Sequence, residues 1–319
     1  MSPTPTKNAL ASLLAQQGIS GEQLTQSLRA LESCGLSEHA TDFRPLSKGM
    51  TNTSYIFRCG NTQYLLRLAG KGTSAFIDRT QEAEVYRLLA GSGITDHALY
   101  LDPSTGTKIT EFVDNARACD PRSQDDMRRC MEHLRRFHEY SLSKKLQSPV
   151  IGNFDLVRKL HEYEEALHTD MTSRFPDYMQ VRAKAEKVAQ FIEKMPREHC
   201  LCHIDPVADN FLLPEGEVRL IDWEYAEMAD PHLDIAMFCI YSGLERAAID
   251  RAMFLYFGHE PTDDIRLKIY AYVGLAGLLW TVWCELRREN GAAYDEYEEI
   301  QYGYPRKYFD LVLDGEVKA

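Results

Sequence analysis

The 319-residue sequence contains no apolar run long enough to cross a membrane and no excess of positive charge. Its longest uncharged apolar stretch, residues 269–284, is shorter than the roughly 20 residues of a membrane span and suits a buried helix. The net charge of −12 argues against nucleic acid or an anionic membrane as a partner held by bulk electrostatics. A cationic substrate suits that charge.

The chain also shows no sign of export. Its first residues, MSPTPTKNALASLLAQQG, contain one lysine and no sustained apolar core, so we expect no signal peptide. The eight cysteines form no CxxC pair and no small disulfide scaffold, and they are most simply read as reduced thiols. We therefore expect a cytoplasmic protein with no membrane insertion.

Neither an internal repeat nor a long low-complexity linker interrupts the chain. Its length exceeds one average domain, and a hydrophobic content of 44% is enough for a sizeable core. Residue periodicity predicts helices and strands in the first part of the chain: helices at 7–17, 21–33 and 79–92, and strands at 42–47, 52–59, 62–69, 97–102 and 106–113. From residue 124 onward the pattern is mostly helical. The predicted fold class is α+β.

One segment carries residues suited to phosphoryl transfer. LCHIDPVADNFLL places His203, Asp205 and Asn210 in the spacing HxDxxxxN, and LIDWEY follows with Asp222. In such an arrangement the Asp205 carboxylate takes a proton from an attacking hydroxyl group, and the Asn210 amide binds a metal ion. Asp222 supplies a second oxygen ligand, whereas His203 is expected to orient the loop by hydrogen bonding.

Between Asn210 and Asp222, two short apolar runs flank the turn-like PEGE. This pattern predicts a hairpin, whose two ends are neighbours in space. Asn210 and Asp222 would then meet at its open end, where oxygen ligands could hold one hard cation together with nucleotide phosphates. Either motif alone is weak, but together they predict a phosphoryl-transfer site.

The two motifs resemble those of the aminoglycoside phosphotransferase and choline/ethanolamine kinase superfamily. IDWEY is most similar to the choline/ethanolamine kinase branch, particularly its bacterial members, and the resemblance covers about residues 43–308. It implies a two-lobed protein-kinase-like fold, with a small antiparallel-sheet N-terminal lobe and a larger, mainly helical C-terminal lobe. It also implies ATP and Mg²⁺ as cofactors.

On the nucleotide side, the resemblance assigns a phosphate-binding role to Gly49, Thr51 and Asn52 in SKGMTN, although an ordinary hairpin turn would read the same way. Arg67 occupies the place where most kinases carry a strand lysine that pairs with the phosphates. Its implied partner is Glu82 on the following helix. The alternative is an exposed ion pair on a solvated helix face.

The stretch Glu111, Phe112 and Val113 looks like the family's hinge, whose backbone would read the adenine. The lobes would meet just after it. We therefore expect three parts: an N-terminal helical extension at 1–40 packed on the small lobe, a nucleotide-binding lobe at 41–115, and a catalytic and substrate-binding lobe at 116–319.

On the acceptor side, Trp280 and Trp283 lie three residues apart on a predicted helix and share a face. Such pairs are usually core. A trimethylammonium group, however, is best held by aromatic faces, and this pair looks like the tryptophans that line the choline pocket in eukaryotic family members. Tyr241, Tyr297 and Tyr302 are weaker candidates for further walls.

The sequence departs from the family at one point: the helix after the LDIA-like segment lacks the acidic residue that eukaryotic members usually carry there. Glu224 and Asp205 are the nearest candidates to balance the ammonium charge. We expect a kinase that phosphorylates choline, with no obligate protein partner. Two alternatives stay open: a kinase acting on ethanolamine, an aminoglycoside or an amino sugar, and a catalytically silent module that binds a nucleotide or a quaternary amine.

Overall fold

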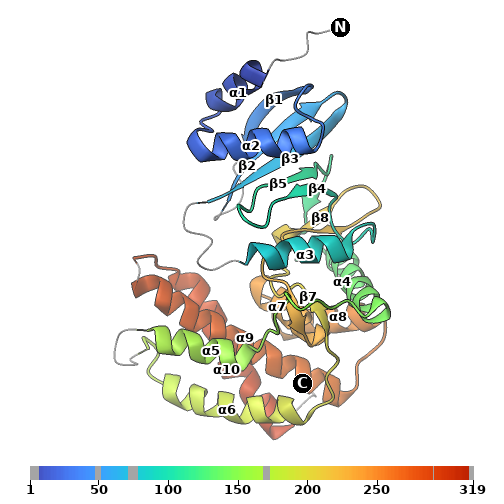
Figure 1. Ribbon diagram of the computed structural model, residues 1–319. Coiled ribbons are helices and arrows are strands. Elements are labelled where there is room, and N and C mark those ends of the chain that lie inside the picture. The colour runs from blue at the N-terminus through green and yellow to red at the C-terminus, as the bar shows by residue number, and fades with distance from the viewer. Residues whose placement is uncertain (1–6, 47–51, 71–77, 168–172, 290, 316–319) are drawn as a thin grey trace. The chain divides into compact units, whose positions relative to one another are not determined.

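A computed structural model describes residues 7–46, 52–70, 78–167, 173–289 and 291–315. The chain forms two compact units (Figure 1). The first unit comprises Met1–Ala118, Ser148–Ile151 and Leu212–Ala226, and the second comprises Cys119–Gln147, Gly152–Phe211 and Glu227–Ala319. An antiparallel sheet in the first unit and a mainly helical second unit confirm the predicted α+β class.

The first unit is built on a five-stranded antiparallel sheet in the order β1-β2-β3-β5-β4. Its strands are β1 (Ala40–Leu46), β2 (Asn52–Cys59), β3 (Thr62–Ala69), β4 (Ala98–Leu101) and β5 (Lys108–Glu111). Three helices accompany them: α1 (Lys7–Gln16), α2 (Gly21–Ser33) and α3 (Arg79–Leu89). Each of these elements was predicted, with ends that differ by a few residues.

Strand alternation gives this sheet two different faces. Leu66 and Leu68 of β3 and Ile109 of β5 are fully buried and pack in one hydrophobic core with apolar side chains of α1 and α2. Arg67 lies between the two leucines, and Lys108 directly precedes Ile109, so both side chains point to the opposite face, where they contact Glu82 of α3. One face is therefore closed by apolar packing, and the other carries buried charges.

Helix α3 begins at a clear capping site. The Asp78 side chain accepts hydrogen bonds from the backbone N–H groups of Thr80 at 2.9 Å and Gln81 at 3.2 Å. This cap satisfies two of the N–H groups that a helix leaves unpaired at its start. It fixes the first turn of α3, which carries Glu82.

The predicted hairpin between Asn210 and Asp222 is confirmed. Strands β8 (Phe211–Leu213) and β9 (Arg219–Leu220) are neighbours in a three-stranded sheet with β6 (Arg117–Ala118). The sequence predicts one lobe for 116–319, whereas most of this hairpin, Leu212–Ala226, belongs to the first unit. The Leu220 N–H donates to the Ile94 carbonyl at 2.9 Å, and the Trp223 indole N–H donates to Thr95 Oγ1 at 2.8 Å.

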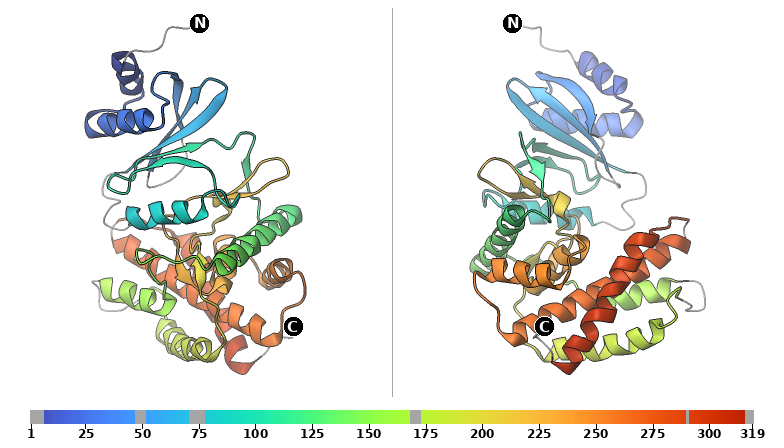
Figure 2. Two further views of the ribbon diagram at one scale, coloured as in Figure 1. Left: turned by 45° about the vertical axis from the view of Figure 1, so that its right-hand side comes forward. Right: turned by 180° about the vertical axis from the view of Figure 1, so that it is seen from behind.

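The second unit contains seven helices among the described residues: α4 (Gln124–Lys144), α5 (Leu156–Ala166), α6 (Tyr178–Lys194), α7 (Pro231–Tyr241), α8 (Arg246–Phe257), α9 (Asp263–Glu289) and α10 (Asp295–Asp314). Two short strands, β7 (Cys200–Cys202) and β10 (Glu227–Ala229), pair antiparallel. Helices α9 and α10 run side by side (Figure 2). A Cβ on Gly277 of α9 would lie 2.7 Å from the Gln301 carbonyl oxygen of α10, so this close approach requires glycine.

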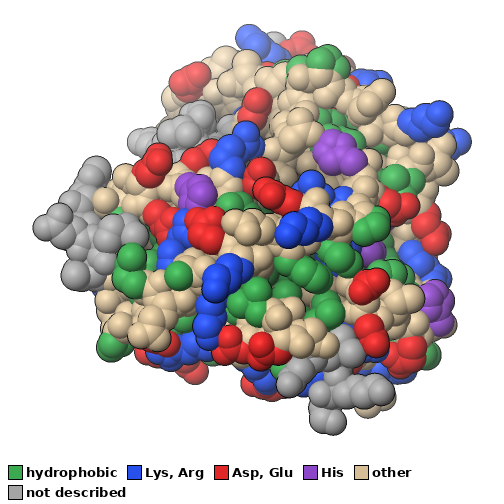
Figure 3. Space-filling model, turned by 90° about the horizontal axis from the view of Figure 1, so that it is seen from below, with side chains coloured by type: hydrophobic (Ala, Val, Ile, Leu, Met, Phe, Trp, Pro, Cys, Tyr) green, Lys and Arg blue, Asp and Glu red, His purple; other side chains and the backbone are tan. Residues whose placement is uncertain are grey.

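Helix α9 contains the long apolar stretch and, within the part of the chain that the structure describes, is the one helix long and apolar enough to cross a membrane. Of its most apolar window, 83% is buried inside the protein, as predicted for a core helix. All eight cysteines are free thiols. On the face seen from below, acidic and basic side chains are interspersed, with apolar side chains between them (Figure 3).

Candidate active site

The loop that carries Asp205 follows β7 and contains a strained residue. Ile204 has φ 67°, a left-handed conformation that a β-branched side chain rarely adopts. Asp234 of α7 stabilises this turn, because its Oδ2 accepts the His203 N–H at 2.7 Å and its Oδ1 accepts the Ile204 N–H at 2.8 Å. One buried carboxylate thus fixes the backbone just before Asp205.

Asp234 is held in turn by a buried histidine. His138 Nε2 lies 3.0 Å from Asp234 Oδ2, and Nδ1 lies 2.8 Å from the Tyr256 hydroxyl oxygen. Since a carboxylate only accepts, Nε2 is the donor to Asp234. Sequence reasoning missed both Asp234 and His138. The available signal was a single carboxylate within the otherwise apolar helix PHLDIAMFCIY, because a buried acid needs partners.

His138 and Asp234 also lie close to Cys202, and ligand atoms of all three are within 4.8 Å of one another. The hydrogen bonds described above already use both ring nitrogens of His138 and both oxygens of Asp234. The Cys202 thiol contacts the Ala229 carbonyl oxygen at 3.5 Å. Hydrogen bonding therefore accounts for this cluster without a metal ion.

Asn210 ends a short 3-10 turn, Ala208–Asn210, in the second unit. Its side-chain N–H donates to the Asp205 carbonyl oxygen at 3.0 Å, which leaves the amide oxygen as the group suited to a hard cation. Asp222 lies in the first unit, with φ 68° and a side chain 38% exposed. Each residue thus presents an oxygen donor within its own unit, and their sharing of one cation stays a prediction.

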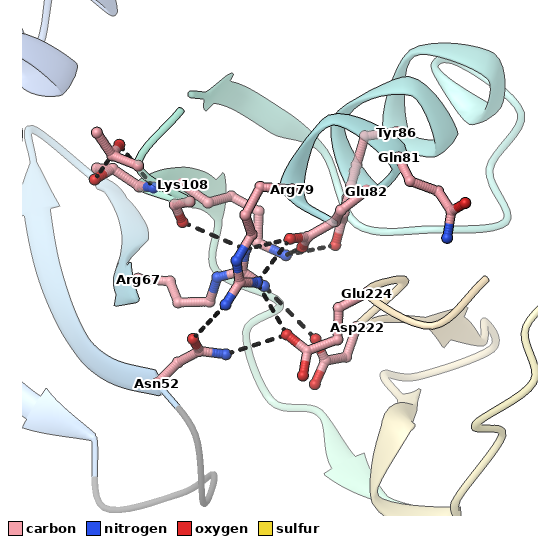
Figure 4. Close-up of polar contacts among 12 residues, drawn as sticks. Asn52, Arg67, Arg79, Gln81, Glu82, Tyr86, Lys108, Asp222 and Glu224 are labelled. Atoms are coloured by element: carbon pink, nitrogen blue, oxygen red, sulfur yellow. Dashed lines mark hydrogen bonds and ion pairs between the residues drawn. The ribbon is translucent and has the colours of Figure 1, made fainter. Parts of the chain in front are cut away.

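In the first unit, three cationic side chains surround Glu82 (Figure 4). Arg67 Nη2 lies 2.6 Å from Glu82 Oε2, Arg79 Nη1 lies 3.0 Å from the same oxygen, and Lys108 Nζ lies 3.3 Å from Oε1. Burial alone would raise the pKa of Glu82, but Lys108, Arg67 and Arg79 hold it at about 2. The carboxylate is therefore ionised at neutral pH.

Arg67 also faces Asp222, with 3.6 Å between Nη1 and Oδ1. Burial would lower the pKa of Arg67, but Glu82 and Asp222 raise it above its usual value. The structure thus brings Arg67 together with Glu82 and Asp222. Glu84, two residues after Glu82, instead forms an ion pair with Arg87, an exposed side chain on the same helix.

Sequence reasoning missed Arg79 and Lys108. Arg79 Nη1 lies 3.0 Å from Glu224 Oε2, and Arg79 Nη2 donates to Asn52 Oδ1 at 3.2 Å. The position of Arg79, three residues before Glu82 on one helix, was the signal available. Lys108 carried a signal too, since strand alternation places it on the same face as Arg67 across the pairing of β3 with β5.

The predicted phosphate-binding residues are only partly described. Gly49 and Thr51 lie outside the described residues. The amide of Asn52 is engaged by charged partners: its oxygen accepts from Arg79, and its nitrogen donates to Glu224 Oε2 at 3.4 Å. In this conformation the Asn52 side chain contacts Arg79 and Glu224.

The predicted hinge begins at Glu111, the last residue of β5. The Glu111 N–H donates to the His97 carbonyl and the Phe112 N–H to the Gln63 carbonyl, each at 2.9 Å. These two N–H groups are thus used within the protein. The reading of an adenine by this segment stays a prediction, for which the Val113 N–H is the candidate donor.

Aromatic side chains of the second unit form a connected series. Trp280 packs edge-to-face on Tyr241 at 5.3 Å between ring centroids and on Trp283 at 5.1 Å, and Trp283 lies 5.3 Å from Tyr294. All four are partly exposed. By contrast, Trp223 is fully buried. Partial exposure distinguishes the series from ordinary core packing.

This aromatic series begins close to Asp205. Burial raises the pKa of Tyr241 well above its usual value, and the charge of Asp205 and a hydrogen bond to it add to the shift. Burial, followed by the charges of Cys284 and Asp205, likewise raises the pKa of Tyr297. The structure therefore brings Tyr241, Trp280 and Trp283 together, with Asp205 at one end. Tyr294 was not predicted.

Tyr302, the remaining candidate, lies elsewhere in the second unit. It is fully buried, stacks on Phe175 at 3.9 Å between centroids, and its hydroxyl donates to Asp177 at 3.1 Å. The Arg306 guanidinium lies over its ring. These contacts are those of a structural residue between α10 and the start of α6.

Comparison with known proteins gives consistent matches. The family model for choline/ethanolamine kinase matches residues 43–250. Protein LicA of Haemophilus influenzae is 25% identical over 277 residues, which is 82% of this chain and 78% of that protein. A solved choline/ethanolamine kinase family protein from Mesorhizobium loti has a TM-score of 0.73 at 24% identity and covers 97% of both chains. Choline kinase LicA from Streptococcus pneumoniae has a TM-score of 0.71 at 24% identity, covering 90% of this chain and 99% of that one. The structural matches show the protein-kinase-like fold.

Proposed function

This chain belongs to the choline/ethanolamine kinase family, and we propose that it transfers the γ-phosphoryl group of ATP to the hydroxyl group of choline. Membership of the family makes it a phosphotransferase with an alcohol group as acceptor. The finer proposal concerns which alcohol it accepts. The name of the Streptococcus pneumoniae structure, a choline kinase, supports choline as the acceptor here.

The observation that carries the proposal is the partly exposed aromatic series of Tyr241, Trp280 and Trp283, which starts beside Asp205. A quaternary ammonium group has no N–H to donate, so aromatic faces suit it, each contributing about 0.5 to 2 kcal/mol. Its methyl groups add apolar contact with the rings. A primary ammonium on the same rings would leave N–H donors unpaired, at a cost of about 1 to 3 kcal/mol.

We assign Asp205 to the acceptor hydroxyl group and Arg67 to the nucleotide phosphates. Asp205 orients the choline hydroxyl and accepts its proton, on a loop that Asp234 holds rigid. Arg67 places positive charge where the phosphates would bind.

Asn210 and Asp222 offer the amide and carboxylate oxygens that Mg²⁺ prefers, so the residues present fit this ion. When bound, the ion neutralises charge on the nucleotide phosphates.

Of the two carboxylates considered for the ammonium charge, Glu224 is the weaker candidate. It is buried and already ion-paired with Arg79 at 3.0 Å. Asp205 lies close to Tyr241 and Tyr297, so we propose that its carboxylate balances the charge of the substrate ammonium group. Free thiols at all eight cysteines fit a reducing compartment, and we propose that the enzyme acts in the cytoplasm.

A coupled ADP-release assay tests the acceptor. The panel contains choline, ethanolamine, an amino sugar and an aminoglycoside, each titrated at saturating MgATP. We expect kcat/KM for choline to exceed that for ethanolamine by about tenfold or more, because about 1.4 kcal/mol separates them. Equal values for the two amines, or a preference for the aminoglycoside, would contradict choline as the acceptor.

A further inference from the structure

The contacts of Arg79 go beyond those expected of a helix-surface arginine. Its guanidinium reaches three different segments of the first unit: Glu82 in the first turn of α3, Glu224 just after β9, and Asn52 at the start of β2 (Figure 4). The distances are 3.0, 3.0 and 3.2 Å. Because the guanidinium is a planar fork with five N–H donors, it can serve several acceptors at once.

The fold makes room for this side chain at Gly106. A Cβ on Gly106 would lie 2.8 Å from Arg79 Nε and 3.0 Å from Arg79 Cδ. Gly106 also has φ +70°, which L side chains rarely adopt. The guanidinium is therefore confined from one side by backbone and from the other by acceptors, and Arg79 is 6% exposed.

The Arg79–Glu224 pair bears directly on Asp222, two residues before Glu224. Asp222 has φ 68°, so its backbone needs support from its surroundings to keep that conformation. Two neighbouring residues supply it: Trp223 donates to Thr95, and Glu224 pairs with Arg79. Arg67 contacts the Asp222 carboxylate itself at 3.6 Å.

Arg79 also offsets charge. Glu224 is buried and lies two residues after Asp222, so two carboxylates occupy the same short segment of the first unit. The ion pair with Arg79 occupies the buried Glu224 carboxylate, whereas the Asp222 side chain is 38% exposed and is the one suited to meet a cation.

We infer that Arg79 is a positioning residue for the metal-binding carboxylate: through Glu224 it fixes the segment that carries Asp222 and thereby sets how strongly Mg²⁺ increases nucleotide affinity. The inference rests on the proposed role of Asp222 as a metal ligand. Arg79 does not itself touch the metal or the nucleotide in this scheme. Its effect should therefore be seen in magnesium-dependent binding and not in the binding of choline.

The test is calorimetric binding of ADP to the full-length protein, with and without Mg²⁺, which needs no acceptor. The measured quantity is the ratio of the two affinities. Arg79→Gln should reduce this ratio about tenfold, and Glu224→Gln several-fold. The double variant should bind MgADP no more weakly than Arg79→Gln alone, because the two residues act as one unit. Arg79→Lys keeps the charge but loses the fork, and it should recover part of the ratio.

Arg87→Gln is the matched control, because Arg87 lies on the same helix in an exposed ion pair with Glu84. It should leave the ratio unchanged. Thermal unfolding of each variant separates loss of stability from loss of magnesium dependence. If Arg79→Gln does not fold, Arg79→Lys and Glu224→Gln carry the test, and a wild-type ratio in both overturns the inference. Equal weakening of ADP binding with and without Mg²⁺ also overturns it, since that is the result expected of a purely structural role.

Asp222→Asn separates the proposed metal role of Asp222 from the positioning role of Arg79. It should abolish most of the magnesium dependence. A wild-type ratio in Asp222→Asn means that the proposed metal role of this residue is wrong. A wild-type protein that binds MgADP but releases ADP with none of the amino alcohols would contradict the proposed acceptor instead, and the binding ratio would still decide the role of Arg79.

Discussion

Glu82 in the first unit and Asp234 in the second are both fully buried carboxylates, but their partners differ. Glu82 is surrounded by Arg67, Arg79 and Lys108. Asp234 accepts hydrogen bonds from the backbone N–H groups of His203 and Ile204 and from the His138 ring. A buried carboxylate can thus be stabilised by opposite charges or by oriented dipoles.

The difference fits what each unit is proposed to bind. The Glu82 carboxylate holds three cationic side chains together, and one of them, Arg67, faces Asp222, which suits a polyanionic nucleotide. Backbone N–H groups around Asp234 fix the turn before Asp205 and add no cation near the aromatic surface, which suits a quaternary amine. The first unit therefore depends on electrostatics that respond to pH, and the second on geometry.

The largest expected effect comes from the residue that the Asp234 network positions. Asp205→Asn should lower kcat by about a thousandfold, because the variant cannot accept the hydroxyl proton. Affinity for MgADP should stay within about twofold of wild type, in line with a role confined to the transferred group. ADP release and calorimetric ADP binding give the two values. Asp209→Asn, an exposed carboxylate on the same loop, is the control, and near-normal turnover in Asp205→Asn would remove this carboxylate from the mechanism.

The next effect concerns the contribution of the Glu82 charge to the stability of the folded protein. The pKa of Glu82 is held at about 2 in the folded protein, below its usual value of 4.5. A depressed carboxylate pKa stabilises the folded state above the unfolded pKa, and this contribution is lost as pH falls from about 4.5 to about 2. The shift corresponds to about 3 kcal/mol at neutral pH.

Urea unfolding of wild type and Glu82→Gln across this pH range measures that contribution. We expect Glu82→Gln to be the less stable protein at pH 7, since it leaves three cations with one fewer counter-charge. The gap between the two proteins should narrow as pH falls through the window. A gap that is constant with pH would show that the loss comes from packing and not from charge.

The geometric side is tested at Asp234. An asparagine in its place offers one acceptor oxygen where two backbone N–H groups need partners, so the turn at Ile204 should loosen. Asp234→Asn should lower kcat about tenfold to a hundredfold while KM for choline and for MgATP change little. Asp230→Asn, at the N-cap of the same helix, is the matched control, because it breaks the buried ion pair with Lys268 instead. The control should lose stability but keep most of its kcat, and equal kcat losses in both would mean that Asp234 acts only through the fold.

The smallest effect separates aromatic recognition from simple burial. Trp283→Phe and Trp283→Leu keep much of the bulk but weaken the cation–π attraction in that order. KM for choline should rise in the same order, to about tenfold for leucine, while KM for MgATP stays unchanged. Tyr302→Leu serves as the control, since Tyr302 packs on Phe175 away from the aromatic series. An unchanged KM for choline in both Trp283 variants would return the tryptophan pair to core packing.

Local patterns were enough to predict most elements of this protein. Alternating apolar residues predicted β2 and β3, helical periodicity predicted α2, and the PEGE turn predicted the hairpin of β8 and β9. Motif spacing was enough to select Asp205, Asn210 and Asp222 as candidates, because phosphoryl transfer needs those residue types in a fixed order. These inferences succeed because they depend on neighbours within a few residues along the chain.

Contacts between distant segments could not be read in the same way. The meeting of Arg79 with Glu224, 145 positions apart, depends on how α3 and the β8–β9 hairpin pack within the first unit. The same holds for Asp234 beneath the Asp205 loop and for the separation of Tyr302 from the aromatic series. Residue type alone does not distinguish a buried tyrosine from one that faces a ligand. The local order of the chain thus determined which chemistry was available, and tertiary packing decided which side chains surround it, because burial and charge pairing arise only when distant segments meet.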